Sequence, residues 1–132
     1  MMKRAILSAA FLLTILTACQ ESLEKRAART WQEYTEKNCP QVITETITMD
    51  SCVFETDTRI LHFYYRFMGA MDQDSIETKT DTMRKLLLEA LRNETSLRVY
   101  KEAGYGFAYT YFSDREPGRL RYETYFTKED YQ

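Results

Sequence analysis

Three cysteines and a single histidine are the residues of this chain best suited to form a covalent cross-link or to hold a metal ion. Cys39 and Cys52 lie 13 positions apart and could form a disulfide or supply two ligands to a metal. Zinc normally takes four ligands, and His62, the only histidine, cannot complete such a set. A Cys-x-x-Cys redox motif is absent from the sequence. A structural disulfide is therefore favoured over a metal site, and we expect no metal and no cofactor.

Catalysis would require a base beside a nucleophile, or two carboxylates facing each other across a cleft. His62 falls inside an aromatic segment typical of a strand, and no Gly-x-Ser-x-Gly turn offers it a serine. We therefore expect His62 to be a packed or hydrogen-bonded strand residue. The carboxylates available to a small hydrolase occupy strand faces or turns, where charges ordinarily face water: Glu45, Glu55, Asp57, Asp72 and Asp74.

The N-terminus has the composition of an export signal. Lys3 and Arg4 precede an uncharged run of 14 residues, Ala5 to Ala18. Crossing a bilayer takes roughly 20 apolar residues, so this run is too short to span one and has the length of a signal-peptide core. The alternative is a buried helix of a cytosolic domain, which would normally show a polar stripe that is missing here. Residues 1–18 are therefore predicted to be a signal peptide.

The segment Leu16-Thr17-Ala18-Cys19 resembles the lipobox of bacterial lipoproteins, which has leucine three positions before the cysteine and a small residue directly before it. The resemblance implies cleavage before Cys19 and attachment of diacylglycerol to its thiol. Thr17 departs mildly from the serine, alanine or glycine that is more usual. Two or three acyl chains anchor a protein almost permanently. An ordinary signal peptide cut elsewhere would leave an unpaired exported thiol, which is a liability.

In lipoproteins of proteobacteria, aspartate after the lipidated cysteine typically retains the protein in the inner membrane. Gln20 therefore favours the outer membrane, facing the periplasm. Disulfides persist in such an oxidising compartment. With Cys19 carrying lipid, Cys39 and Cys52 form an even pair whose bridge would contribute about 3 kcal/mol.

The remaining chain has the size and charge of one small acidic domain. The signal segment carries two of the 18 basic residues and none of the 20 acidic ones, which leaves a formal net charge of −4. Such a chain lacks the basic surface that nucleic-acid binding requires. We predict a lipidated tether at residues 19–24 and a single domain at residues 25–132.

Periodicity predicts the elements that must position these residues. The expected helices are 20–37, 76–92 and a short one at 97–103; the expected strands are 41–54, 60–71, 105–112 and 119–126; the expected tail is 127–132. The order α-β-β-α-(short α)-β-β predicts an α+β fold with one antiparallel four-stranded sheet and helices mainly on one face. This order, with its Asn-Cys-Pro start, is similar to that of small exported αββαββ bacterial proteins without assigned activity. That resemblance carries no catalytic residues.

The chain is rich in aromatic residues, with ten tyrosines and seven phenylalanines. Tyrosine is favoured at binding surfaces because it combines a large rigid area with a polar tip. One hypothesis is that an open sheet face docks a partner through Tyr64, Arg66, Tyr109, Tyr111, Arg121 and Tyr125. The alternative is that these side chains merely alternate between buried and exposed faces.

Two functional hypotheses follow. The first is a lipid-anchored, non-catalytic envelope protein that recognises another protein or a cell-wall component, as an inhibitor, an immunity protein or an assembly factor. The second is a small envelope hydrolase that uses carboxylates.

Overall fold

The computed structural model describes residues 21–132. The predicted signal peptide, the predicted lipidation site Cys19 and Gln20 lie outside the described residues. The helices are α2 (Leu23–Asn38), α3 (Thr80–Asn93), α4 (Arg98–Glu102) and α5 (Lys128–Tyr131), and 3-10 turns occupy Gly69–Met71, Asp74–Lys79 and Thr95–Leu97. The strands are β1 (Gln41–Thr44), β2 (Ile47–Glu55), β3 (Ile60–Phe67), β4 (Gly106–Ser113) and β5 (Leu120–Phe126). None of the helices described is long and apolar enough to cross a membrane.

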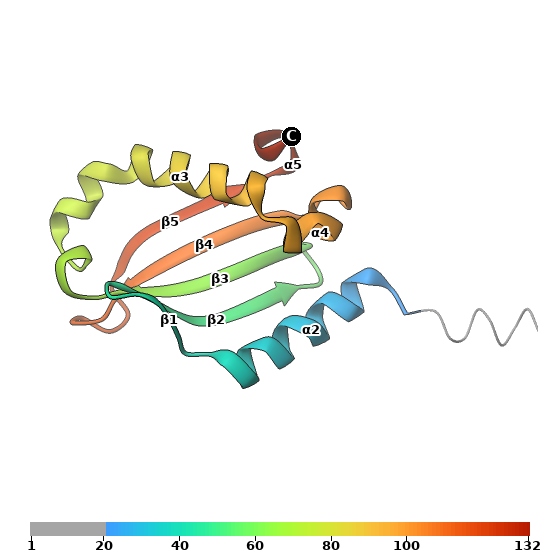
Figure 1. Ribbon diagram of the computed structural model, residues 1–132, viewed down its shortest axis with the longest axis horizontal. Coiled ribbons are helices and arrows are strands. Elements are labelled where there is room, and N and C mark those ends of the chain that lie inside the picture. The colour runs from blue at the N-terminus through green and yellow to red at the C-terminus, as the bar shows by residue number, and fades with distance from the viewer. Residues whose placement is uncertain (1–20) are drawn as a thin grey trace, which may run out of the picture.

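The five strands form one sheet in the order β1-β2-β3-β4-β5 (Figure 1). The α+β class is confirmed, but the predicted four-stranded sheet is wrong because the segment expected as one strand, 41–54, folds back on itself. At this turn the Thr46 amide donates to the Thr44 hydroxyl at 3.2 Å, and β1 pairs with β2 antiparallel. Threonine closes the turn where glycine, proline or asparagine would have marked it.

The sheet is mixed rather than antiparallel. The pairs β2–β3 and β4–β5 are antiparallel, as the two predicted hairpins require, whereas β3 and β4 run parallel. The chain between β3 and β4 crosses over through α3 and α4 and returns to the end of the sheet from which β3 began. Such a crossover makes the next strand parallel, whereas a hairpin makes it antiparallel.

Helix α2 begins inside the predicted tether. The Ser22 side chain accepts from the Lys25 amide at 3.2 Å and caps the helix, which starts at Leu23. One face of α2 packs on β2, with Ala27 buried and Trp31 placed 6.0 Å from Phe63 between ring centres. The helix therefore covers the side of the sheet nearest β1 and β2.

The segment predicted as a polar tail is instead the short helix α5. Thr127 and Asp130 cap its first turn reciprocally. Tyr131 is buried, and its hydroxyl donates to the Tyr105 carbonyl at 2.8 Å. The C-terminus is thus fastened to the start of β4.

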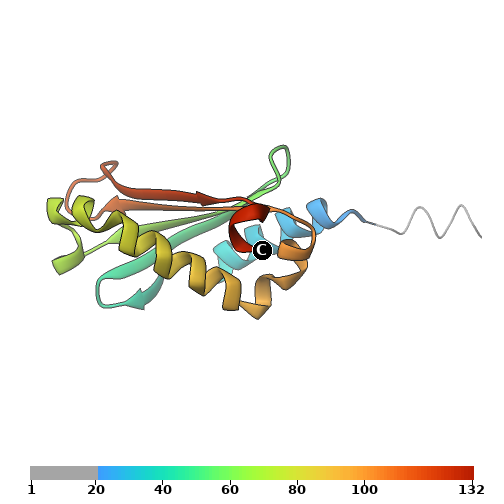
Figure 2. The same cartoon turned by 90° about the horizontal axis from the view of Figure 1, so that it is seen from above.

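Helices lie on one face of the sheet (Figure 2), as predicted. In β4, Phe107 and Tyr109 point to the helical side, where Phe107 meets Tyr131 and Tyr109 stacks on Phe63. Leu91 of α3 belongs to the same buried cluster. Within residues 21–132 no helix covers the opposite face, which carries His62 and Thr110, among others.

Candidate functional site

The six residues of the predicted binding face do not form one surface. Tyr64, Arg66 and Tyr125 lie on the face without helices, and Tyr125 is 46% exposed. Tyr109 and Tyr111 are buried on the helical side, where Tyr111 stacks on Tyr65 and Phe67. Arg121 is also buried, in an ion-pair network. The reason is strand parity: bulky β4 residues alternate with small ones, and the bulky set faces the helices.

A groove on the helical side brings together the aromatic side chains of β3 and β4. In Figure 1, α2 lies beside β2 and α3 beside β5, with the central strands between them. The groove has a volume of about 200 Å³ and is lined by Phe63, Tyr65, Leu87, Ala90, Leu91, Glu94, Leu97 and Tyr109. Its floor is therefore aromatic, and its wall is one apolar stripe of α3.

The tyrosines beneath this groove are held as uncharged phenols. Phe63 stacks on Tyr109 at 5.1 Å, and Tyr65 stacks on Tyr111 at 4.6 Å, between ring centres. Burial raises the pKa of Tyr65, of Tyr109 and of Tyr111 above the ordinary value. The floor thus presents apolar ring area together with neutral hydroxyl groups, a combination suited to an amphipathic partner.

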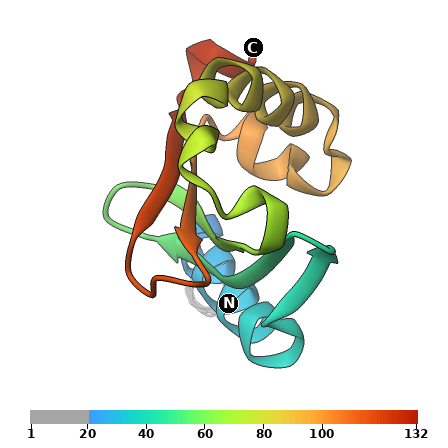
Figure 3. The same ribbon diagram turned by 90° about the vertical axis from the view of Figure 1, so that its left-hand side faces the viewer.

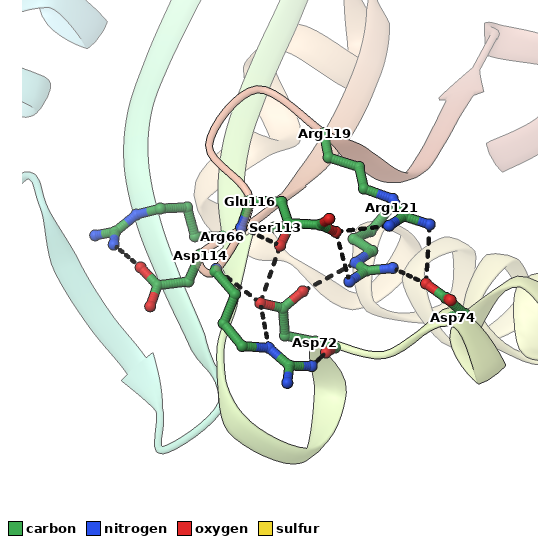
Figure 4. A network of polar contacts seen from close by, with 9 residues as sticks. Arg66, Asp72, Asp74, Ser113, Asp114, Glu116, Arg119 and Arg121 are labelled. Atoms are coloured by element: carbon green, nitrogen blue, oxygen red, sulfur yellow. Dashed lines mark hydrogen bonds and ion pairs between the residues drawn. The ribbon is translucent and has the colours of Figure 1, made fainter.

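Asp72 is the centre of a polar network at the end of the sheet that carries the β1–β2 and β4–β5 turns (Figures 3 and 4). Its carboxylate is fully buried and accepts hydrogen bonds from the Ser113 hydroxyl (3.0 Å), the Arg115 amide (2.9 Å) and Arg121 Nε (2.9 Å). Burial acts to raise the pKa of Asp72, but these hydrogen bonds outweigh it and hold the pKa well below the ordinary value. The expectation that this carboxylate faces water was wrong.

Alternating charges continue this network toward solvent. Arg121 Nη1 donates to Asp74 at 2.6 Å, and Arg119 donates to Asp74 and to Glu116 at 2.9 and 2.6 Å. These side chains line a cleft of about 580 Å³ together with Gln73 and Arg115. Because each arginine is paired with a carboxylate of the same cluster, the cleft neutralises itself, and its role is to fasten the β4–β5 turn to the 69–79 segment.

Arg66 is neutralised in the same way. Its Nε lies 2.8 Å from Asp50 and its Nη1 lies 2.7 Å from Asp114, as Figure 4 shows for the latter. Arg66 therefore links β2 and β3 to the β4–β5 turn, and does not offer a free positive charge to a partner.

Cys39 and Cys52 are free thiols in this structure, so the predicted disulfide is not present in it. The Thr35 side chain contacts both residues. Its hydroxyl donates to the Cys52 carbonyl and accepts from the Cys52 amide, both at 2.9 Å, and it also interacts with the Cys39 thiol. Thr35 therefore joins α2 to the edge of β2.

His62 is a hydrogen-bonded strand residue, as predicted. Its Nε2 lies 2.6 Å from the Thr110 hydroxyl and its Nδ1 lies 3.1 Å from Glu55. This order of carboxylate, imidazole and hydroxyl resembles a hydrolytic triad. Thr110, however, is only 2% exposed and sits within the sheet, so a substrate carbonyl cannot reach its hydroxyl. Within residues 21–132, no three His, Cys, Asp or Glu side chains are grouped to hold a metal.

A family model described as "Domain of unknown function (DUF8479)" matches residues 22–122. The chain belongs to this family. The matched range includes the groove and the whole Asp72 network. No curated protein matches the chain.

Three solved structures share the fold. A Pseudomonas aeruginosa protein described as "a putative secreted protein" is 14% identical, with 86% of this chain and 100% of that chain covered and a TM-score of 0.67. Pilotin AspS of the type II secretion system of Vibrio cholerae is 13% identical, with 82% and 91% covered and a TM-score of 0.59. Pilotin EpsS from the Vibrio vulnificus type II secretion system is 13% identical, with 83% and 92% covered and a TM-score of 0.59. At these identities the likeness is one of fold.

Proposed function

We propose that this DUF8479 chain is a lipid-anchored, non-catalytic binding module that assists the assembly of another protein in the bacterial cell envelope. The observation that carries the proposal is the aromatic groove between α3 and the central strands. We assign to it an amphipathic segment of a client protein, with its apolar side chains on the rings and a polar group near the tyrosine hydroxyls. Rigid aromatic side chains in a concave site are the usual anchors of such contacts.

Two further observations support an envelope role. The segment Leu16-Thr17-Ala18-Cys19 has the lipobox pattern, and a lipid on Cys19 would hold the domain at a membrane. Two proteins of the same fold are pilotins of type II secretion systems. An assembly role is therefore preferred over inhibition or immunity, and the outer membrane is the proposed location.

The groove can be blocked without disturbing the core. Ala90 lines the groove but is exposed, and it lies in α3, where arginine is a good helix former. Leu86, one turn earlier, is 61% exposed and does not line the groove. Ala90→Arg therefore places a long charged side chain over the aromatic floor, and Leu86→Arg is its matched control.

The experiment uses the full-length protein, captured by affinity from its own membranes after cross-linking. We expect the wild type and Leu86→Arg to recover the same client. We expect Ala90→Arg to recover at least tenfold less of it. Equal recovery with Ala90→Arg would show that the groove is not the docking site. Failure to recover any reproducible client with the wild type would contradict the binding role itself.

A further inference from the structure

A chain of polar side chains crosses the face of the sheet that has no helices. It runs from Glu55 in β2 to His62 in β3, Thr110 in β4 and Glu123 in β5, one residue from each of four adjacent strands. Glu55 Oε1 lies 3.1 Å from His62 Nδ1, His62 Nε2 lies 2.6 Å from Thr110 Oγ1, and Thr110 Oγ1 lies 2.7 Å from Glu123 Oε2. The groove on the other side of the sheet does not involve these groups.

Hydrogen-bond chemistry fixes the proton on one side of the imidazole. An ionised carboxylate only accepts hydrogen bonds, so the Thr110 hydroxyl must donate to Glu123. That hydroxyl then has only lone pairs to offer His62, and Nε2 must be the N–H that donates to it. Nε2 therefore carries a proton whether the ring is neutral or charged.

Nδ1, the other ring nitrogen of His62, has two neighbours. One of them can bind Nδ1 only when it is unprotonated, and the other only when it is protonated. The Tyr64 hydroxyl lies 3.2 Å from Nδ1, and the two rings are stacked with centres 4.0 Å apart. Tyr64 keeps its own proton, because burial, and then the charges of Glu55 and Glu123, raise its pKa. The Tyr64 hydroxyl can therefore donate to a bare Nδ1, whereas Glu55 can only accept from a protonated one.

We infer that His62 Nδ1 is a proton-operated switch that exchanges Tyr64 for Glu55 as its partner. With one proton on the ring, Nδ1 accepts from Tyr64, and the Glu55 carboxylate keeps only the Thr58 hydroxyl as a side-chain partner, at 3.5 Å. When the ring takes a second proton from water, Nδ1–H donates to Glu55, and the charged ring keeps Tyr64 as a stacked aromatic neighbour. The charged groups facing His62 are Glu55 from β2 and Glu123 from β5; β4 contributes the uncharged Thr110, and β3 contributes Tyr64.

The output of the switch is the β2–β3 turn. Glu55 is the last residue of β2, and its carbonyl accepts from the Arg59 amide at 2.8 Å, which closes the turn. The doubly protonated ring ties this turn to the sheet through Glu55 and reduces the negative charge of the open face by one.

The test follows the ring nitrogens of His62, the only histidine, by NMR of the ¹⁵N-histidine-labelled protein from pH 8 to pH 5. Nε2 is expected to carry a proton throughout, while Nδ1 changes from bare to protonated. Glu55→Gln removes the charged-state acceptor and should move the Nδ1 transition to lower pH. Tyr64→Phe removes the neutral-state donor and should move it to higher pH.

Asp57→Asn is the matched control, because Asp57 is an exposed carboxylate of the same turn, whereas the side-chain partners of His62 are Glu55, Tyr64 and Thr110. The Nδ1 transition of this variant should match that of the wild type. The inference would be overturned if Nδ1 is protonated and Nε2 is unprotonated in the wild type at pH 8. This outcome needs no variant. An Nδ1 transition that Glu55→Gln leaves unchanged would overturn it as well.

Discussion

Replacing Asp72 with alanine should destabilise the fold by about 3–5 kcal/mol, the cost of breaking a buried ion pair by removing one partner. The Asp72 carboxylate is fully buried and accepts from Ser113, Arg115 and Arg121. Its removal leaves the buried Arg121 side chain with only its outer partners, and two further donors without an acceptor. A loss of this size is a large share of the 5–15 kcal/mol typical of a domain.

Urea unfolding followed by fluorescence measures this loss. Trp31, the only tryptophan, packs against Phe63 and Tyr100 and reports on the core. Asp74→Ala is the matched control: it also pairs with Arg121, but its side chain is 75% exposed, so its replacement should change stability little. A loss for Asp72→Ala no greater than that for Asp74→Ala would refute the assignment of Asp72 as the centre of the network.

The same carboxylate predicts a pH dependence. The pKa of Asp72 is held below its ordinary value of 3.8 in the folded protein, so its contribution is present above about pH 4 and is lost as the pH falls further. The stability difference between the wild type and Asp72→Asn should therefore be constant near neutral pH and shrink below pH 4. A difference that stays constant from pH 6 to pH 2 would contradict this linkage.

Two other changes test the anchor and the helix–sheet junction. Cys19→Ser should move the protein from the membrane fraction to the soluble fraction on fractionation of cells, and retention in the membrane would contradict the lipid anchor. Thr35→Val keeps the shape of the side chain but deprives the Cys52 amide and carbonyl of their partner, so urea unfolding should show a loss of about 1–3 kcal/mol. Thr30→Val, at an exposed position of the same helix, is the control; equal losses for the two variants would argue against the junction.

The sequence predicted the α+β class and most helices and strands, because the hydrophobic periodicity that indicates them depends only on residues close together in the chain. It failed at residues 45–46, where a run of β-branched residues interrupted only by Glu45 hides a turn. It also failed at Asp72, whose local surroundings are those of an exposed turn. The partners that make its burial favourable, Ser113 and Arg121, are 41 and 49 positions away and are brought to it only by the crossover.

The candidate site shows a similar limit. Alternation correctly separated Tyr109 from Thr110, but alternation does not say which set of residues the helices cover. In β4 the small residues Gly106, Ala108 and Thr110 occupy the open face, which is the signal that could have placed the tyrosines on the helical side. The groove itself depends on the position of α3, which no local pattern encodes.

With a lipid on Cys19, the serine cap of α2 would limit the distance between the domain and the bilayer. Four residue steps separate Cys19 from Leu23, which at full extension span about 14 Å. With so short a linker, the lipidated domain would remain in a thin layer above the headgroups and would not diffuse through the space between membranes. Its encounters with a client would be two-dimensional, governed by lateral diffusion and by which side of the domain is turned to the lipid.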